Sequence, residues 1–239
     1  TTDYLTEEYP LQFIVHVPEL FANDHLLDLC TPDSKYRQIS IDYMKEIVEL
    51  TQTLQQHFNK TRRPKIVIHC GGFSMDQHFD IGERQAYYDR LLLSLNEIND
   101  PSIELLPENM APFPWHFGGQ RYQNLFVLPD EIEEKCTLMN LRICLDVSHS
   151  MLTCNHFNIE FYEFIDKVAP FTAHIHMGDA KGVNGEGLQI GEGDIDFKRL
   201  CKILIDKAPK ASFIPEIWQG HKNNGEGFWI ALDRLNGLL

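Results

Sequence analysis

Six short apolar runs in this chain each end in a side chain that can bind a metal ion. These side chains recur every 30 to 53 positions and are His16, His69, Glu108, Asp146, His176 and Glu216. A (β/α)₈ barrel spends about 30 residues on each strand–helix unit, and its active site lies where the strands end. Ligands that recur at this period, each after a strand-like run, predict one metal site at the mouth of a parallel barrel.

Glu108, Asp146, His176 and Glu216 would offer a divalent cation three carboxylates and one imidazole. That mixture suits Mn²⁺, Zn²⁺, Co²⁺ or Fe²⁺, whereas an all-oxygen set favours Mg²⁺ or Ca²⁺. A single Glu at a strand end is more often a salt-bridge or capping partner. Several carboxylates converging inside a barrel would be costly without a cation. We therefore expect a divalent metal cofactor, zinc or manganese, with one or two ions bound.

His16 and His69 leave two interpretations open. Both follow strand-like runs, so they would add a second metal ion bridged by Glu108. Alternatively, they are hydrogen-bonding partners of a substrate, or histidines of the core.

Two further residues stand close to expected ligands. His149, three residues after Asp146, is expected in the same mouth as a substrate contact or proton donor. Asp179, three residues after His176, is expected either to orient that imidazole or to contact substrate.

Two loops carry side chains that we expect to line a substrate pocket. They are Trp115, His116 and Phe117 in the first loop and Trp218, His221 and Lys222 in the second. Aromatic loop residues also serve as plain packing, and this alternative stays open. The glycine-rich segment 182–197 lacks the strand–GxGxxG–helix arrangement of a dinucleotide site, so we expect a mobile loop there.

Strands and helices alternate along the chain, as a parallel sheet with helical crossovers requires. Strands are expected at 11–17, 65–70, 103–107, 141–147, 172–177 and 212–217. Helices are expected at 40–58, 80–98, 129–139, 159–168, 196–207 and 226–238. We therefore expect an α/β fold, a (β/α)₈ TIM barrel, as one domain over 1–239.

The strand count falls short of the eight that such a barrel needs. Residues 1–10 are too few and too polar to supply two more units. We expect the first two units to be missing or to lie upstream, so that the chain is the C-terminal portion of a barrel in a longer polypeptide. A shortened or open barrel is the alternative.

Composition limits the partners and the cellular location. A net charge of −14 and a pI near 5.1 disfavour nucleic acid, because such partners usually need a basic face. No apolar stretch is long enough to span a bilayer, and the first residues do not have a signal-peptide pattern. The six cysteines form no C-x-x-C pair, which indicates a reduced, cytoplasmic protein.

Seven segments together resemble the xylose-isomerase-like TIM barrel superfamily, which includes sugar isomerases and epimerases alongside apurinic-site endonucleases. They are VHVPE, VIHCGG, LLPEN, CLDVSH, HIHMGD, GLQIGEGDIDF and PEIW. By resemblance to the ketose epimerases, Glu108, Asp146, His176 and Glu216 would hold one metal. The same resemblance implies that Glu108 and Glu216 exchange the substrate proton, and His149 matches the histidine of the D-x-x-H element.

The endonuclease branch of this superfamily has two histidines equivalent to His16 and His69. It also has an Asp-x-His pair where this chain has Gly185, Glu186 and Gly187. This departure disfavours a trinuclear zinc cluster and leaves a dinuclear one open. The segment PEIWQGHKNNGEGFWIALDRL also resembles a barrel domain appended to sialic-acid-synthase-type proteins.

The resemblance leads us to expect a metal-dependent isomerase or epimerase that acts on a sugar or sugar phosphate through an enediolate. The narrower resemblance points to bacterial surface-sugar (nonulosonate) metabolism. The alternatives are a phosphodiester hydrolase of the apurinic-site endonuclease type and a barrel domain without catalytic activity. The expected ligand is a small sugar, and no membrane association is expected. The expected protein partner is either a second copy of the chain, in a homo-oligomer, or an upstream domain of the same polypeptide.

Overall fold

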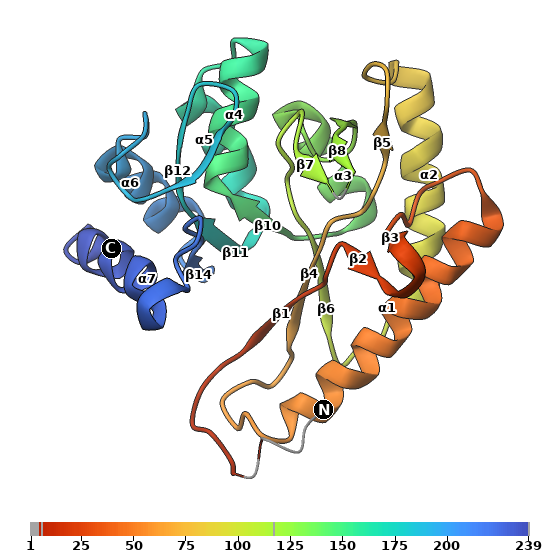
Figure 1. Ribbon diagram of the computed structural model, residues 1–239, viewed down its shortest axis with the longest axis horizontal. Helices are drawn as coiled ribbons and strands as arrows, with labels where there is room; N and C mark the ends of the chain where they lie inside the picture. Colours follow the sequence, from red (N-terminus) through yellow and green to blue (C-terminus); the bar gives the residue numbers. More distant parts are fainter. Residues whose placement is uncertain (1–4, 6, 117, 239) are drawn as a thin grey trace. The chain divides into compact units, whose positions relative to one another are not determined.

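The computed structural model describes residue 5, residues 7–116 and residues 118–238 (Figure 1). The expected pocket residue Phe117 lies outside this range. The chain separates into two compact units. Unit 1 is Thr1–Pro107 with Trp115–Arg121, and unit 2 is Glu108–Pro114 with Tyr122–Leu239. Within the described residues, no helix has both the length and the apolar character that crossing a bilayer requires.

Unit 1 is built on a parallel sheet of three strands in the order β1-β4-β6. The strands are β1 (Ile14–His16), β4 (Lys65–Ile68) and β6 (Glu104–Pro107). Val15 pairs with Ile66, and Ile66 pairs with Leu105 on its other side. The central strand β4 is apolar and its last three residues are buried, as expected for a strand covered on both faces.

Two long helices, α1 (Ser34–Gln55) and α2 (Ile81–Ile98), pack side by side in unit 1 (Figure 1). Asp33 caps α1 by accepting hydrogen bonds from the backbone N–H groups of Lys35 and Tyr36. Asp80 and Glu83 form a capping box at the start of α2. The shorter elements of this unit are β2 (Leu20–Phe21), η1 (Ala22–Asp24), β3 (His25–Leu26), β5 (Phe73–Ser74), β7 (Trp115–His116) and β8 (Gly119–Gln120).

Unit 2 has a second parallel sheet, in the order β10-β11-β14. Its strands are β10 (Ile143–Asp146), β11 (Thr172–Met177) and β14 (Ser212–Pro215). Asp146 pairs with His176, and His176 pairs with Ile214. This register places candidate ligands of neighbouring strands next to one another.

The remaining elements of unit 2 are helices and short strands. The helices are α3 (Pro129–Met139), α4 (Val147–Phe157), α5 (Phe161–Val168), η2 (Ala169–Phe171), α6 (Phe197–Lys207) and α7 (Lys222–Leu235). The additional strands are β9 (Tyr122–Gln123), β12 (Asp179–Lys181) and β13 (Gly185–Leu188). The last two pair in antiparallel fashion as a hairpin.

The six expected strands and six expected helices are present; β11 and α3 have the expected ends and the others differ from the expected bounds. Helix α1 begins at Ser34 rather than at residue 40, because Asp33 supplies the cap. Helix α7 begins at Lys222, but Asn223, Asn224 and Gly225 have left-handed backbone angles, so its regular part starts near the expected residue 226. That the whole chain is one domain stays a prediction.

Two expectations for unit 2 are wrong. The sequence predicts no helix between 147 and 158, where α4 lies. The residues from Val147 to Cys154 are all buried, so the helix lacks the polar face that reveals most helices. The segment 182–197, expected to be a mobile loop, contains strand β13 and backbone held by hydrogen bonds to Asp179.

Candidate metal centre

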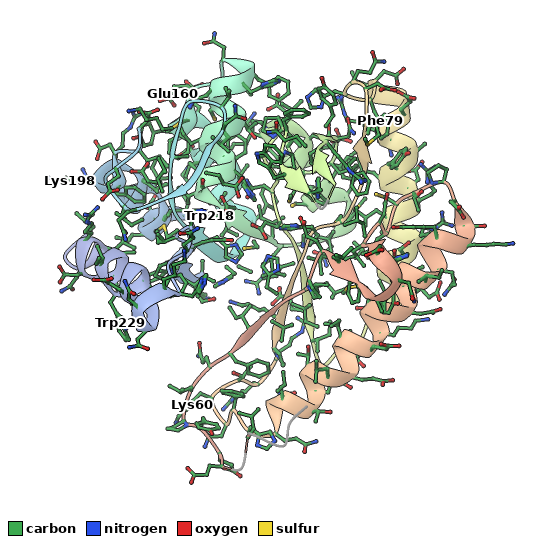
Figure 2. The ribbon with its side chains drawn as sticks, viewed as in Figure 1. Lys60, Phe79, Glu160, Lys198, Trp218 and Trp229 are labelled. Carbon is green, nitrogen blue, oxygen red and sulfur yellow. The ribbon has the colours of Figure 1, made fainter. Side chains whose placement is uncertain are left out.

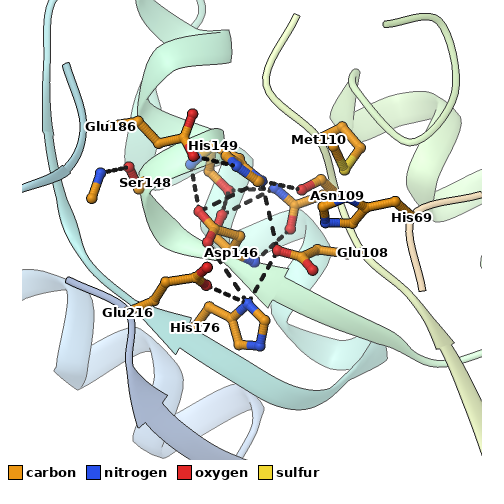
Figure 3. Close-up of polar contacts among 12 residues, drawn as sticks. His69, Glu108, Asn109, Met110, Asp146, Ser148, His149, His176, Glu186 and Glu216 are labelled. Carbon is orange, nitrogen blue, oxygen red and sulfur yellow. Dashed lines mark hydrogen bonds and ion pairs between the residues drawn. The ribbon is translucent and has the colours of Figure 1, made fainter. Parts of the chain in front are cut away.

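Four of the expected ligands meet in unit 2: Glu108, Asp146, His176 and Glu216. One ligand atom from each lies within 4.8 Å of the others (Figure 3). Asp146 ends β10, His176 lies near the end of β11, and Glu216 directly follows β14. Glu108 joins them through a parallel bridge to Cys144 of β10. The carboxyl ends of parallel strands share one edge of a sheet, and this geometry brings the four side chains together.

Three carboxylates converge on one imidazole nitrogen. His176 Nδ1 lies 2.6 Å from Glu216 Oε2, 3.1 Å from Glu108 Oε1 and 3.9 Å from Asp146 Oδ2. Glu108, Asp146 and His176 are almost completely buried, whereas 49% of the Glu216 side chain is exposed. One nitrogen carries at most one proton, so His176 cannot compensate three carboxylates. A divalent cation held among the four side chains would offset the remaining negative charge.

Burial and neighbouring charges act together on the pKa values of this cluster. Burial raises the pKa of Asp146 to about 8, and the charges of Glu216 and Glu108 add to this rise. Burial disfavours the imidazolium form of His176, but the neighbouring Glu108 raises its pKa well above the usual range. Burial also opposes ionisation of Glu216, but its hydrogen bond with His176 outweighs this and lowers its pKa. The donor set of three carboxylates and one imidazole therefore fits a divalent cation such as Zn²⁺ or Mn²⁺.

Asn109 holds Asp146 in place, a role that the sequence did not reveal. Its Oδ1 accepts a hydrogen bond from the Asp146 N–H at 2.7 Å. Its Nδ2 donates to the Asp146 carbonyl and to Ser150 Oγ, both at 3.0 Å. Asn109 is fully buried beside Glu108, so one dipeptide provides both a candidate ligand and a support for another.

His149 lies beside the four ligands, as predicted, on the first turn of α4. The backbone N–H of His149 donates to Asp146 Oδ1 at 2.5 Å, so Asp146 also caps this helix. Its Nδ1 lies 2.9 Å from the Asn109 carbonyl and 3.7 Å from Glu108 Oε1. Its Nε2 lies 3.3 Å from Glu186 Oε1, a contact that the sequence analysis missed. Burial opposes the charged imidazole, but Asp146 and Glu186 raise the pKa of His149 well above its ordinary value.

Asp179 has a different role from the expected ones. Its buried carboxylate accepts hydrogen bonds from four backbone N–H groups, those of Ala180, Gly191, Gly193 and Ile195, at 2.8 to 3.2 Å. These bonds fold the segment after the hairpin. We therefore correct its assignment from an orienting or substrate-binding residue to an anchor of the loop.

His16, His69 and His116 belong to unit 1, where two of them meet Glu19. His69 Nδ1 lies 2.7 Å from Glu19 Oε1, and His116 Nδ1 lies 3.5 Å from the same atom. The rings of His16 and His69 are perpendicular, with centroids 5.1 Å apart. Burial opposes ionisation of Glu19, but hydrogen bonds with His116 and His69 hold its pKa well below the usual range. A second metal ion at His16 and His69 stays a prediction.

The expected pocket residues are mostly exposed. Trp115, in unit 1, has 70% of its surface exposed. In unit 2, Trp218, which is labelled in Figure 2, is exposed. Its backbone N–H donates to the Gly187 carbonyl at 2.7 Å. His221 is exposed at the start of α7, and Lys222 Nζ donates to Gln219 Oε1 at 2.8 Å. Substrate contacts from these residues remain predictions.

The order of the elements, parallel strands that alternate with helices, is that of the α/β barrel class. The sequence profile of one family of that class, described as "Xylose isomerase-like TIM barrel", matches residues 2–235. The chain belongs to this family. The expected TIM-barrel fold class is thereby confirmed.

Relatives of known sequence or structure are similar over most of the chain. "Probable endonuclease 4" of Haloquadratum walsbyi is 27% identical over 233 residues, which cover 92% of this chain and 76% of that protein. The structure of a D-tagatose 3-epimerase-like protein aligns with a TM-score of 0.65 and 20% identity, over 95% of this chain and 80% of its own. The structure of L-ribulose 3-epimerase aligns with a TM-score of 0.68 and 14% identity, over 95% of this chain and 74% of its own. None of these matches supports the resemblance to a sialic-acid-synthase-associated domain.

Proposed function

We propose that this protein is a metal-dependent isomerase or epimerase of a sugar or sugar phosphate. The observation that carries the proposal is the position of two glutamates, Glu108 and Glu216, within one cluster that could hold a metal ion. Two carboxylates around a single site suit a reaction that removes a proton from carbon and returns it. The structural similarity to sugar 3-epimerases supports the fold in which such a site lies.

Glu108, Asp146, His176 and Glu216 would hold the cation. When bound, it would act as a Lewis acid that polarises a substrate carbonyl and the adjacent hydroxyl group. The Asn109 side chain holds the backbone of Asp146 through a hydrogen bond, and the pairing of β11 with β10 sets the position of His176. Two of the four candidate ligands are thereby positioned by strands β10 and β11.

The two glutamates differ in burial in a way that suits their roles. Glu108 is buried, and nearly half of the Glu216 side chain is exposed. Glu216 is therefore the more accessible group, and one of the pair removes the proton from the substrate carbon while the other returns it. His149 lies 3.7 Å from Glu108, where a protonated imidazole would stabilise the negative charge that develops on the enediolate.

The test is turnover of ketoses and their phosphates in D₂O by protein loaded with Zn²⁺ or Mn²⁺. The wild-type protein should produce epimer or isomer that carries deuterium at the carbon next to the carbonyl. Glu216→Gln should lower kcat by about 10²–10⁴-fold, the range for loss of a general acid–base. Glu133→Gln, which changes an exposed glutamate of α3, is the control and should retain activity. Full activity together with full metal content in Glu216→Gln would refute the role.

A second candidate is a phosphodiester hydrolase, which the 27% identity to a probable endonuclease favours. Such enzymes use two metal ions about 3.5–4 Å apart. The hydrolase hypothesis requires His16 and His69 as additional ligands. This hypothesis predicts that the protein cleaves DNA with an abasic site. It also predicts that the wild-type protein binds two zinc equivalents and that one of them is lost in His16→Ala and in His69→Ala. The isomerase hypothesis expects one equivalent that these substitutions leave in place.

A further inference from the structure

Two hydrogen bonds attach the hairpin of β12 and β13 to segments that carry residues of the candidate metal centre. The Gly187 N–H donates to Ser148 Oγ on the first turn of α4, at 2.9 Å. The Gly187 carbonyl accepts from the Trp218 N–H, two residues after Glu216, at 2.7 Å. The backbone next to Glu186 is therefore fixed to the helix that carries His149 and to the loop that carries Glu216.

Glycines on both sides of Glu186 make this close attachment feasible. A Cβ at Gly185 would lie 2.6 Å from the Lys181 carbonyl oxygen, which no side chain tolerates. Gly187 has φ +62°, and a Cβ there would lie 3.2 Å from the Trp218 nitrogen. The Gly–Glu–Gly sequence thus permits a tight backbone whose single side chain is a carboxylate.

Glu186 directs that carboxylate towards His149 (Figure 3). Its Oε1 lies 3.3 Å from His149 Nε2, while His149 Nδ1 contacts the Asn109 carbonyl. Both nitrogens of the imidazole are thereby engaged, which fixes the ring. His149 is buried, whereas 46% of the Glu186 side chain is exposed, so Glu186 is the outer member of the pair.

Glu186 also changes the charge that an incoming molecule meets. It is a fourth carboxylate beside the three of the metal cluster. A phosphate dianion that approached this side chain would be repelled, strongly so in a partly buried site. A neutral hydroxyl group would instead donate a hydrogen bond to the carboxylate.

We propose that Glu186 determines substrate specificity by favouring a neutral polyhydroxy substrate over a phosphorylated one, through a hydrogen bond to a substrate hydroxyl group and its contact with His149. This inference rests on the proposed isomerase function and narrows it to unphosphorylated sugars. Repulsion of the unwanted ligand gives as much discrimination as attraction of the right one.

The first experiment uses inorganic phosphate as the probe and does not depend on activity. Calorimetric titration of the metal-loaded protein with phosphate should show weak binding to the wild-type protein. Binding should be about tenfold tighter in Glu186→Gln, which removes one charge without changing shape. Glu186→Asp keeps the charge and should remain weak. Glu192→Gln, which alters an exposed glutamate of the same segment, is the matched control and should also remain weak.

The second experiment compares kcat/KM for a ketose and for the same ketose with a terminal phosphate. Glu186→Gln should raise KM for the neutral sugar and shift the ratio towards the phosphorylated one by about tenfold or more. Tight phosphate binding by the wild-type protein, or equal binding by wild type and Glu186→Gln, would overturn the proposal. If neither sugar is turned over by the wild-type protein, the proposed function fails, and phosphate binding still decides the role of Glu186.

Discussion

Gly178 offers the most direct test of how the backbone positions a ligand. It lies between β11 and β12, two residues after His176. A Cβ at this position would lie 2.6 Å from the Glu216 carbonyl oxygen. This distance is about 0.8 Å shorter than the 3.4 Å at which ordinary contact begins, and both partners belong to the backbone or are fixed to it. In Gly178→Ala, the Glu216 backbone therefore has to move by most of that amount.

The expected consequence is a loss of metal affinity in addition to a loss of stability. Overpacking of this kind costs about 1–3 kcal/mol of folding free energy. Metal–ligand distances tolerate only about 0.2 Å, so a larger shift of Glu216 removes or weakens one of four ligands. We expect the affinity for Zn²⁺ to fall by about 10–100-fold, similar to the effect of disturbing the support of a ligand.

Calorimetric metal titration and thermal unfolding of the metal-free protein measure the two effects separately. Gly182→Ala is the matched control, because a Cβ there meets nothing within 4 Å, although its φ of +61° carries some strain. It should lose stability and keep its metal affinity. Wild-type affinity in Gly178→Ala, or an equal loss of affinity in both variants, would refute the reasoning.

Three further predictions concern stability. Burial raises the pKa of Cys136 and Cys154 to about 12 and that of Cys201 to about 11, against 9.0 in an ordinary thiol. The folded chain keeps protons that the unfolded chain loses above pH 9, so the unfolding free energy should be intact below pH 9. Above pH 9 the unfolding free energy should fall by up to about 1.4 kcal/mol for each pH unit and for each of these thiols. Denaturant titrations at pH 8 and pH 10 measure this difference. Asp179→Ala should cost about 3 kcal/mol or more, because it leaves several buried and part-buried backbone N–H groups without their acceptor. Asp194→Ala should cost under about 1 kcal/mol in the same thermal assay. Asp80→Ala should cost about 1 kcal/mol by removing the capping box of α2, and an unchanged melting temperature would contradict this.

The sequence predicted the strand ends and their candidate ligands because both depend on local pattern. A β-branched apolar run followed by a carboxylate or imidazole identifies the end of a buried strand, and parallel strands bring such ends to one edge. This sufficed for Asp146, His176 and Glu216. The starts of helices were predicted less well where the cap lay outside the amphipathic stretch, as Asp33 does for α1.

The supporting residues were not predictable because their partners are distant in the sequence. Asn109 bonds to residues 37 and 41 positions away, and nothing around it signals that contact. Glu186 lies between two glycines, a pattern typical of a loop, and it meets His149 only because the hairpin is attached to α4. Glu19 was missed for the same reason, since its partner His69 is 50 positions away.

Helix α4 has a consequence for how this protein tolerates mutation. A surface helix accepts substitutions with a period of 3.6 residues, since one face meets water. The first eight residues of α4 are all buried, and its hydroxyl groups are committed as well. Ser150 Oγ donates to the Asp146 carbonyl at 2.7 Å and Thr153 Oγ1 to the Met110 carbonyl at 3.3 Å. Variation should therefore be restricted at every position of this segment. Among related sequences, this part of α4 should be more conserved than the amphipathic helices of the chain.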